Sequence, residues 1–334
     1  MRLVCVALLV GLGLSACGAQ SASGVATRYE AVHQAMGTEF RLSLYARDQA
    51  SANAVSDEVF DEIDRLDDLL SNYKPQSELS RINREAKGWV VTDPETFAFL
   101  QRAQYWSARS HGAFDMTVGP LLKVWGFFRK QGRVPTDADL AEARTRVGWQ
   151  HVQLRTEDHA VRFEDGRQME LDPGSIGKGF AVDKAVALMR ADGVQAALLS
   201  SGGSTVYALG TPPGQDGWPV MVPDPQHGTT ETLRLRDTSI STGACTEKFF
   251  VQAGKRYCHI FNPLTGRPVE GVVQSSVISR SATDSDAVST VVFVLPQRAL
   301  ERALKAERSV SALVYRTQAR GNVTRQGIRW PVAQ

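Results

Sequence analysis

The sequence of 334 residues has little of what marks several large classes of protein. Beyond its first residues it has no apolar run of the roughly 18–20 residues that a membrane-spanning helix needs, so we expect the body of the chain to be soluble. The net charge is only +2, and charged residues make up 22% of the chain without a basic stripe. This balance argues against nucleic acid as a partner.

Cysteine is also scarce. Of the four cysteines, Cys5 lies in an apolar leader and Cys17 follows that leader. The remaining two, Cys245 and Cys258, are too few for a disulfide scaffold and lack the spacing of a metal site. Whether they form a single disulfide stays open, although an oxidising compartment would permit one.

Common catalytic and nucleotide-binding motifs are missing. The chain has no G-x-S-x-G, no H-E-x-x-H and no Cys/His hydrolase pattern. Its most glycine-rich turn is not a Walker A loop, because Asp172 stands where that motif has its first glycine and Gly179 where it has a hydroxyl residue. The dinucleotide fingerprint does not fit either, since Gly174, Gly177 and Gly179 show its two spacings in reverse order.

That turn, Leu171–Asp183 with the sequence LDPGSIGKGFAVD, is the most informative stretch that is present. It places an acid, three glycines and Lys178 between a strand-like run (Gln168–Leu171) and a helix-like run (Ala181–Arg190). Glycine permits sharp turns and close approach of a ligand, and a helix start offers unpaired N–H groups to an anion. These residues alone fit a phosphate-binding loop and an ordinary turn with a solvated lysine equally well.

The N-terminus predicts export and a lipid anchor. Arg2 precedes the apolar segment Leu3–Leu14, which is too short to span a bilayer, and Leu14-Ser15-Ala16-Cys17 resembles a bacterial lipobox. We therefore expect residues 1–16 to be a signal peptide, Cys17 to carry the lipid and residues 17–28 to be a flexible tether. The alternative is a plain secretory peptide cut near Ala16 or Ala19. Residues 29–334 remain, which is enough for one large domain or two intimate ones, and we expect them in the bacterial cell envelope, facing the periplasm.

Several hairpins with interleaved helices predict an α+β fold of antiparallel sheets with packed helices. Apolar residues at three- and four-residue steps predict a helix over Ser51–Leu70, and a cap at Asp93 before Pro94 predicts a second helix that stops before Gly112. Further helices are expected over Thr136–Val147, Phe180–Arg190, Asp284–Leu295 and Gln297–Ala306. The expected strands are Tyr29–Met36, Glu39–Ala46, Gln168–Leu171, His151–Arg155, Ala160–Glu164, Gln195–Ser200, Val206–Gly210, Trp218–Val222, Glu231–Arg236, Ser239–Ala244, Lys248–Gln252, Tyr257–Phe261, Val272–Ser279 and Ser309–Thr317.

A candidate metal site lies near the C-terminus. Asp286 and Thr290 are four residues apart on a predicted helix, so their carboxylate and hydroxyl point to one side. Mg²⁺ takes about six oxygens, of which one or two are carboxylates and the rest waters and substrate phosphates. An Asp, a Thr and a backbone carbonyl from a glycine-bent loop would suffice. The alternatives are a threonine that faces the core, and Asp284 as the competing carboxylate.

Three further residues have two readings each. His259, at the end of a predicted hairpin, is either a catalytic base or a polar residue with its hydrogen bonds satisfied. Tyr73 and Trp125 could stack on a flat ring or fill the core, and for Trp125 we expect the core.

Together these segments resemble the FAD:protein FMN transferases of the ApbE family. Each motif is weak alone, but all of them occur in order over about residues 31–295. They are Met36-Gly37-Thr38, Ser71-x-Tyr73, Phe114-Asp115-x-Thr117-Val118-Gly119-Pro120, Asp172-x-Gly174-x-x-x-Lys178-Gly179, Ser201-Gly202-Gly203, Thr242-Gly243, His259-Ile260-x-x-Pro263-x-Thr265-Gly266 and Asp286-Ala287-x-x-Thr290.

The resemblance implies an ApbE-like, T-fold-like catalytic domain over residues 29–334, held to the membrane by its lipid. Such an enzyme splits FAD with Mg²⁺, attaches the FMN half through phosphate to a threonine of an acceptor protein, and releases AMP. The acceptor is expected to be a subunit of a membrane redox complex such as sodium-translocating NADH:quinone reductase. The resemblance assigns Mg²⁺ to Asp286, Thr290 and the carbonyl of Ser175, and FAD contacts to Met36, Tyr73, Phe114, Asp115, Met116, Asp172, Lys178 and Ile260.

The catalytic groups expected on this basis are Lys178, Asp286 and His259. The metal and Lys178 would neutralise charge on the pyrophosphate, and His259 would accept the proton of the threonine hydroxyl. Two other activities stay open: an FAD pyrophosphatase in which water attacks, and a lipoprotein that binds flavin without chemistry. The sequence departs from the usual family pattern at Pro173, Ser175, Gly177 and Cys258, but a carbonyl ligand tolerates the change at Ser175.

Overall fold

A computed structural model describes residues 26–128, 131–245, 248–318 and 321–331. The predicted signal peptide, the lipidation site Cys17 and most of the predicted tether therefore lie outside the described residues. The first strand already begins at Thr27, two residues before the expected domain boundary. None of the helices in the described ranges combines the length and the apolar character of a membrane span.

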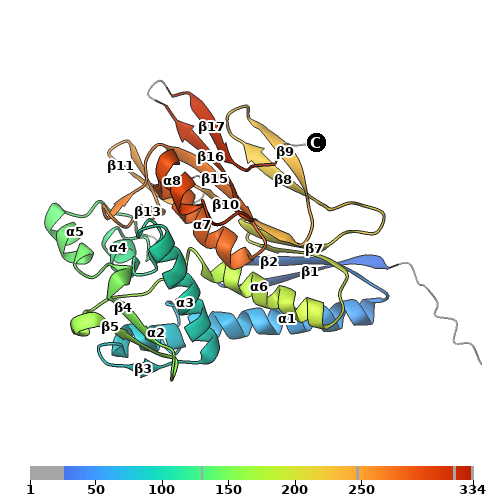
Figure 1. Ribbon diagram of the computed structural model, residues 1–334, viewed down its shortest axis with the longest axis horizontal. Helices are drawn as coiled ribbons and strands as arrows, with labels where there is room; N and C mark the ends of the chain where they lie inside the picture. The colour runs from blue at the N-terminus through green and yellow to red at the C-terminus, as the bar shows by residue number, and fades with distance from the viewer. Residues whose placement is uncertain (1–25, 129–130, 246–247, 319–320, 332–334) are drawn as a thin grey trace, which may run out of the picture.

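An eight-stranded, entirely antiparallel sheet forms the centre of the molecule (Figure 1). Its order is β1-β2-β6-β7-β10-β15-β16-β17, so strands from both ends of the chain complete one sheet. The strands are β1 (Thr27–Ala35), β2 (Thr38–Ala46), β6 (Ala196–Ser201), β7 (Thr205–Gly210), β10 (Thr238–Ala244), β15 (Val272–Ser279), β16 (Ser311–Thr317) and β17 (Val323–Ile328).

Three helices pack together against this sheet: α1 (Gln49–Leu70), α6 (Gly177–Ala191) and α7 (Ala282–Val294). The buried residues of α1 follow the expected three- and four-residue steps, which explains why it was predicted correctly. The hairpin of β8 (Trp218–Asp224) and β9 (Thr229–Leu235) forms a separate apolar cluster with other sheet residues.

A second group of elements lies beside the helices, at the lower left in Figure 1. Its helices are α2 (Glu78–Glu85), α3 (Pro94–Arg109), α4 (Gly119–Val124) and α5 (Asp137–Arg144), and a small sheet joins β3 (Val90–Val91), β5 (Ala160–Phe163) and β4 (Val152–Arg155). The predicted cap at Asp93 is confirmed, since its side chain accepts the amide of Glu95 at 2.8 Å.

The remaining elements are short. They are the β11 (Phe249–Gln252) and β12 (Lys255–Cys258) hairpin, the β13 (Phe261–Asn262) and β14 (Arg267–Pro268) pair, helix α8 (Gln297–Ala303), and two 3₁₀ turns at Trp149–His151 and Glu164–Gly166. Cys245 and Cys258 are joined by a disulfide, with their Cα atoms 5.2 Å apart. Trp125 is 1% exposed and fills the core, as expected.

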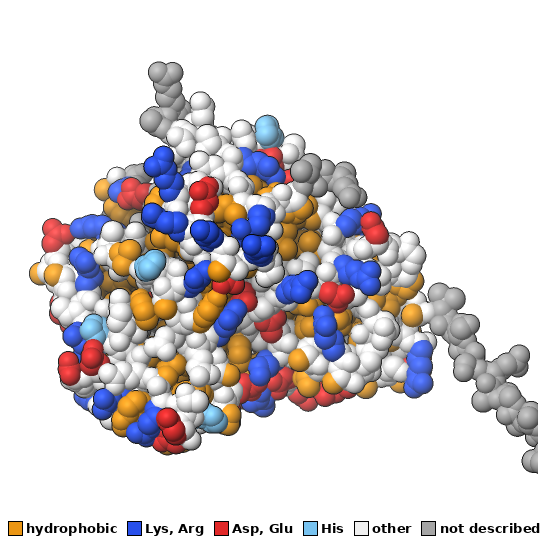
Figure 2. Space-filling view, in the orientation of Figure 1, with side chains coloured by type: hydrophobic (Ala, Val, Ile, Leu, Met, Phe, Trp, Pro, Cys, Tyr) orange, Lys and Arg blue, Asp and Glu red, His pale blue; other side chains and the backbone are white. Residues whose placement is uncertain are grey.

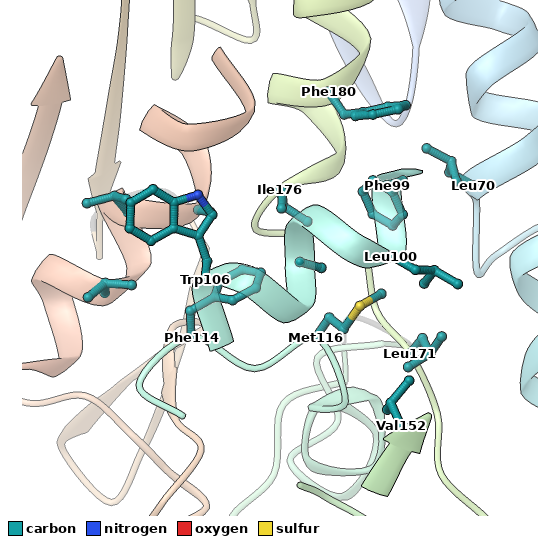
Figure 3. Close-up of a cluster of buried hydrophobic side chains, with 14 of the residues drawn as sticks. Leu70, Phe99, Leu100, Trp106, Phe114, Met116, Val152, Leu171, Ile176 and Phe180 are labelled. Carbon is teal, nitrogen blue, oxygen red and sulfur yellow. The ribbon is translucent and has the colours of Figure 1, made fainter. Parts of the chain in front are cut away.

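One buried apolar cluster connects the large sheet and its three helices with the second group of elements. It joins residues of α3 and α7 to Leu171 and Ile176 at the two ends of the glycine-rich loop (Figure 3). Because Leu171 and Ile176 are both fully buried, the loop between them is fixed at each end. The mixed helix and antiparallel sheet architecture confirms the predicted α+β class.

The sequence-based prediction was wrong in several places. Gln168–Leu171 is not a strand, and α2, α4, β3, β14 and β17 were not anticipated. The structure also begins α6 at Gly177, three residues before the expected Phe180, which places Lys178 in the first turn of a helix. Expected boundaries elsewhere differ by a few residues, as is normal for helix and strand ends.

Candidate active site

The first two residues of the glycine-rich loop, Leu171 and Asp172, are held by hydrogen bonds to their backbone groups. Asn83 donates to the carbonyl of Leu171 at 3.1 Å and accepts its amide at 2.8 Å. The amide of Asp172 donates to the carbonyl of Met116 at 2.7 Å. These contacts satisfy the backbone of Leu171 and the amide of Asp172 in a segment that has no strand partner.

Asp172 lies at the base of this loop with its carboxylate buried. Its Oδ1 accepts the amide of Gly174 at 2.8 Å, and its Oδ2 accepts the Nδ2 of Asn72 at 2.6 Å. Burial raises the pKa of Asp172, although these two hydrogen bonds oppose the rise. The Oδ1 of Asn72 is buried and has no hydrogen-bond partner among the described residues. A buried amide oxygen without a partner indicates that a donor is missing from this point of the site.

Lys178 lies in the first turn of α6, where backbone amides have no carbonyl partner within the helix. Its ammonium donates to the carbonyl of Gly174 at 3.3 Å, so the side chain folds back over the loop. A lysine and a helix N-terminus at one place both favour an anion. This is the arrangement that a phosphate-binding loop requires.

Helix α6 meets α7 through a contact between Gly179 and Asp286. The amide of Gly179 donates to Asp286 Oδ2 at 3.0 Å. A Cβ at position 179 would lie 2.2 Å from the carbonyl oxygen of Ala282, so only glycine permits this approach. Among the described residues, no amide donates to the carbonyl of Ser175, which the amide of Gly179 would reach in a regular helix.

Asp286 and Thr290 lie one turn apart on α7, as predicted. Asp286 is 7% exposed and Thr290 is half-buried, and the hydroxyl of Thr290 has no hydrogen-bond partner in the described part of the chain. The competing carboxylate, Asp284, is used elsewhere: it forms a bidentate pair with Arg102 at 2.5 and 2.6 Å and accepts the indole N–H of Trp106. Asp284 is therefore excluded as the metal ligand.

The start of α7 is fixed by a residue that the sequence analysis did not single out. Asp183 of α6 accepts the amides of Ala282 and Thr283 and the hydroxyls of Ser281 and Thr283, at 2.6–2.9 Å. A carboxylate at a helix N-terminus satisfies amides that the helix itself leaves unpaired. Asp183 thereby sets the position of Asp286 one turn further along.

The residues present fit a hard divalent cation. Asp286 supplies one carboxylate, Thr290 a hydroxyl and Ser175 an unpaired carbonyl, which are oxygen ligands of the kind that Mg²⁺ takes. Groups of three or more His, Cys, Asp or Glu side chains suited to a metal are absent from the described residues. The donor set therefore suits Mg²⁺, which keeps waters and phosphate oxygens, better than zinc, which prefers nitrogen and sulfur ligands.

His259 follows β12 and is held by one carbonyl. Its backbone amide and its Nδ1 both reach the carbonyl of Lys248, at 3.1 and 2.9 Å. A carbonyl only accepts, so Nδ1 carries the proton and Nε2 is left as an acceptor. Burial, together with the charges of Lys248 and Lys178, lowers the pKa of His259 to about 4. The imidazole is therefore neutral at pH 7 and lies within electrostatic range of Lys178.

Tyr73 and Met36 occupy two turns. Tyr73 is 64% exposed and stacks on Phe128, with ring centroids 4.5 Å apart. It does not fill the core, and partial desolvation of its phenol together with the charge of Asp172 raises its pKa. Met36 has a positive φ of 50° in the two-residue turn between β1 and β2, a conformation typical of a type I′ hairpin. Ile260 and Met36 are partly buried and pack against the same large cluster.

The side chains of Phe114, Asp115 and Met116 are buried and do not form an exposed surface. Phe114 and Met116 belong to the large buried cluster, and Asp115 accepts from the amide and hydroxyl of Thr117 and from the amide of Trp149. Burial raises the pKa of Asp115 against these hydrogen bonds. These three residues are at most 5% exposed.

Three site residues, Asn72, Asn83 and Asp183, were missed by the sequence reasoning. Asn72 and Asp183 lie in stretches that the sequence analysis quoted and Asn83 does not, and the partner of each is 88 to 100 residues away in the chain. The side-chain types gave the only local signal, since Asn and Asp commonly bond to backbone groups.

The space-filling view shows Lys and Arg side chains interspersed with Asp and Glu, without a surface of one sign (Figure 2). This face agrees with the small net charge of the sequence.

Comparison with known proteins places the chain in a family. The sequence profile of the ApbE family matches residues 36–314. The FAD:protein FMN transferase of Treponema pallidum is 34% identical over 312 residues, which cover 87% of this chain and 84% of the relative. The enzyme of the same name from Salmonella typhimurium is 30% identical over 281 residues, 81% of this chain and 80% of the relative.

Comparison with solved structures leads to the same family. The apo form of the Pseudomonas stutzeri flavinyl transferase ApbE superposes with a TM-score of 0.81 and 26% identity, covering 91% of this chain and 96% of that one. The ApbE protein of Thermotoga maritima gives a TM-score of 0.79 and 27% identity, covering 90% and 97%. The chain belongs to the ApbE family.

Proposed function

We propose that this chain is an FAD:protein FMN transferase that uses Mg²⁺, modifies a threonine of an acceptor protein and releases AMP. The names of relatives that match more than four fifths of the chain support the transferase activity. The observation that carries the proposal is the contact between Gly179 and Asp286, which brings a helix N-terminus with a lysine next to an oxygen-ligand set suited to Mg²⁺.

The residues divide the binding of FAD between them. Lys178 would hold the pyrophosphate through its ammonium, and Asp172, Asn72 and the exposed ring of Tyr73 would contact the rest of the nucleotide. Met36, Ile260 and the backbone of the Phe114–Met116 segment complete the site. Because Asn72 Oδ1 lacks a partner, a donor group of the flavin or the adenine would satisfy it.

His259 is the proposed proton acceptor. Its Nε2 takes the proton of the threonine hydroxyl as that oxygen attacks the phosphorus on the flavin side of the pyrophosphate. A new P–O bond forms to threonine, and the bond from this phosphorus to the bridging oxygen breaks, so AMP leaves with that oxygen. Lys178 stabilises the negative charge that grows on the leaving phosphate.

Asp286, Thr290 and the Ser175 carbonyl would hold Mg²⁺, which supplies charge neutralisation at the phosphate oxygens when bound. The contribution of the protein itself is to position the ligands of the cation. Asp183 fixes the start of α7 and Gly179 holds Asp286 against α6, so the ligands of the cation are in place before FAD arrives.

We also propose that the enzyme is anchored through a lipid on Cys17 and faces the periplasm. The lipobox-like sequence before Cys17 supports this, and the acceptor would be a domain of a membrane redox complex with a threonine flavinylation motif. Incorporation of labelled palmitate into the full chain, and its loss in Cys17→Ala, would test the anchor.

Product analysis tests the activity. The full chain is incubated with FAD and Mg²⁺, with and without an acceptor domain carrying a threonine-ended flavinylation motif, and AMP and acceptor mass are measured. We expect AMP release and a mass increase of one FMN only when acceptor, FAD and Mg²⁺ are all present, and neither after EDTA. AMP without acceptor would identify an FAD pyrophosphatase, and flavin binding without AMP would identify a carrier.

A further inference from the structure

The disulfide between Cys245 and Cys258 lies next to the proposed base and has no role in the mechanism above. Cys245 directly follows β10 of the large sheet, and Cys258 is the last residue of β12. Cys258 is 4% exposed, and Cys245 packs against the large buried cluster. The bond therefore ties the open end of the β11–β12 hairpin to the end of a central strand.

His259 is the residue directly after this bond. Its amide and its Nδ1 both bind the carbonyl of Lys248, and Lys248 lies in the ring that the disulfide closes. The carbonyl that determines which imidazole nitrogen carries the proton thus directly precedes the first strand of the hairpin, whose first residue, Phe249, pairs with Cys258. Without a fixed Lys248 carbonyl, either nitrogen of the imidazole could carry the proton.

Other contacts hold the far side of the hairpin. Phe250 stacks on Tyr257 across the two strands, and these rings pack against Phe127 and Trp125. In the described residues β11 and β12 form a separate two-stranded sheet with no ladder to the large sheet. Aromatic packing therefore positions one face of the hairpin, and the disulfide positions the end that carries Lys248 and His259.

We propose that the Cys245–Cys258 disulfide positions His259 for the transfer reaction, by holding the Lys248 carbonyl against Nδ1 so that Nε2 stays free as the proton acceptor. The two cysteines are positioning residues and touch no reacting atom. The inference rests on the proposed role of His259. It also makes the transferase sensitive to reduction, because two electrons and two protons convert the bond to two thiols and release the end of the hairpin.

Kinetics on the full chain test the proposal by two independent routes. The disulfide is broken with the phosphine TCEP, which is itself oxidised to its oxide by taking an oxygen from water. Since Cys258 is buried, a Cys245→Ser/Cys258→Ser double variant provides the second route. In both cases we expect kcat for FMN transfer to fall at least about tenfold, with KM for FAD within about twofold. The double variant should not respond further to TCEP.

A double-mutant cycle separates positioning from general destabilisation. If the bond acts through His259, breaking it in a His259→Ala background leaves the residual kcat unchanged. An equal fall in both backgrounds, or an unchanged kcat in the reduced wild-type chain, overturns the proposal. Thermal unfolding curves verify that each variant is folded at the assay temperature.

The tautomer of His259 gives a readout that does not depend on activity. In ¹⁵N-histidine NMR spectra we expect the oxidised protein to show the Nδ1–H form at position 259, and the reduced protein to show a mixture of both tautomers. An unchanged tautomer after reduction contradicts the proposal. If His259→Ala instead keeps full transfer activity, the role of His259 as a base fails, while this spectrum still decides whether the disulfide positions the ring.

Discussion

The backbone amide of Gly179 donates to the carboxylate of Asp286 at 3.0 Å, across 107 residues of sequence. This bond removes the amide of Gly179 from the helix ladder and leaves the carbonyl of Ser175 without a donor among the described residues. One contact therefore joins α6 to α7, orients the carboxylate and leaves a carbonyl available to the proposed cation. The following predictions begin from this pair.

Asp286→Ala should lower the rate of AMP release at least about 100-fold, because the proposed cation loses its only carboxylate. AMP is measured by chromatography at several Mg²⁺ concentrations, and circular dichroism checks the fold. Asp284→Asn is the matched control on the same helix: it should lower the free energy of unfolding by about 1–3 kcal/mol by weakening the bonds to Arg102 and Trp106, and keep the Mg²⁺ dependence. Wild-type turnover in Asp286→Ala would refute the metal assignment.

Gly179→Ala should separate α6 from α7. The added Cβ would lie 2.2 Å from the Ala282 carbonyl oxygen and 2.8 Å from Asp286 Cβ. We expect a loss of about 1–3 kcal/mol in the free energy of unfolding and a larger proportional loss of kcat, since Asp286 must move. Gly88→Ala is the control, because a Cβ there meets no atom within 4 Å. Urea unfolding and transfer rates that leave Gly179→Ala equal to this control would contradict the prediction.

The elements that the sequence predicted best are those whose signal is local. The apolar steps of α1, the Asp93-Pro94 start of α3 and the hairpin turn at Met36-Gly37 need no distant partner. The start of α6 was placed too late because glycine is a poor helix former. The structure uses Gly179 there for close packing against α7, which is a tertiary requirement that no local pattern shows.

The same distinction between local signals and tertiary requirements applies to the residues of the site. Asp286, Thr290, Lys178 and His259 were chosen from the sequence, and the structure places Asp286 and Thr290 one turn apart on α7 and Lys178 in the first turn of α6. The supporting residues Asn72 and Asp183 act on partners about 100 residues away. Their roles follow from tertiary packing that brings distant parts of the chain together, and the sequence alone does not determine that packing.

Asp172→Asn should retain the fold and change how stability depends on pH. Burial raises the pKa of Asp172, so the native state binds more protons than the unfolded state above pH 3.8, and this carboxyl makes stability fall as pH rises through the raised pKa. The variant has no carboxyl at this position and therefore lacks this contribution to the pH dependence of stability. A rotated Asn72 can present its unpaired Oδ1 to the new amide. Urea unfolding from pH 4 to 8 should therefore show a smaller fall in the free energy of unfolding for the variant than for the wild type, while KM for FAD increases. An unchanged fall would show that Asp172 does not titrate differently on folding.

His259 should give transfer activity an unusually low acid limit. With its pKa lowered to about 4 by burial and by Lys178 and Lys248, the imidazole is neutral and able to accept a proton from pH 7 down to about 5. We expect kcat at pH 5.5 within about twofold of that at pH 7.5 under saturating Mg²⁺, whereas a histidine of ordinary pKa, near 6.5, would be about 90% protonated at pH 5.5.

The same pKa shift predicts an effect on stability. The unfolded chain binds a proton at His259 near pH 6.5 and the native chain only near pH 4, so stability is lost as pH falls through this window. His259→Ala removes this contribution and should flatten the unfolding free energy between pH 6.5 and 4, a change that urea titrations detect without any assay of activity. A rate profile with its acid limit near 6.5, together with parallel unfolding profiles for the two proteins, would show that the imidazole is not held neutral by its surroundings. The base would then have to be sought elsewhere in the site.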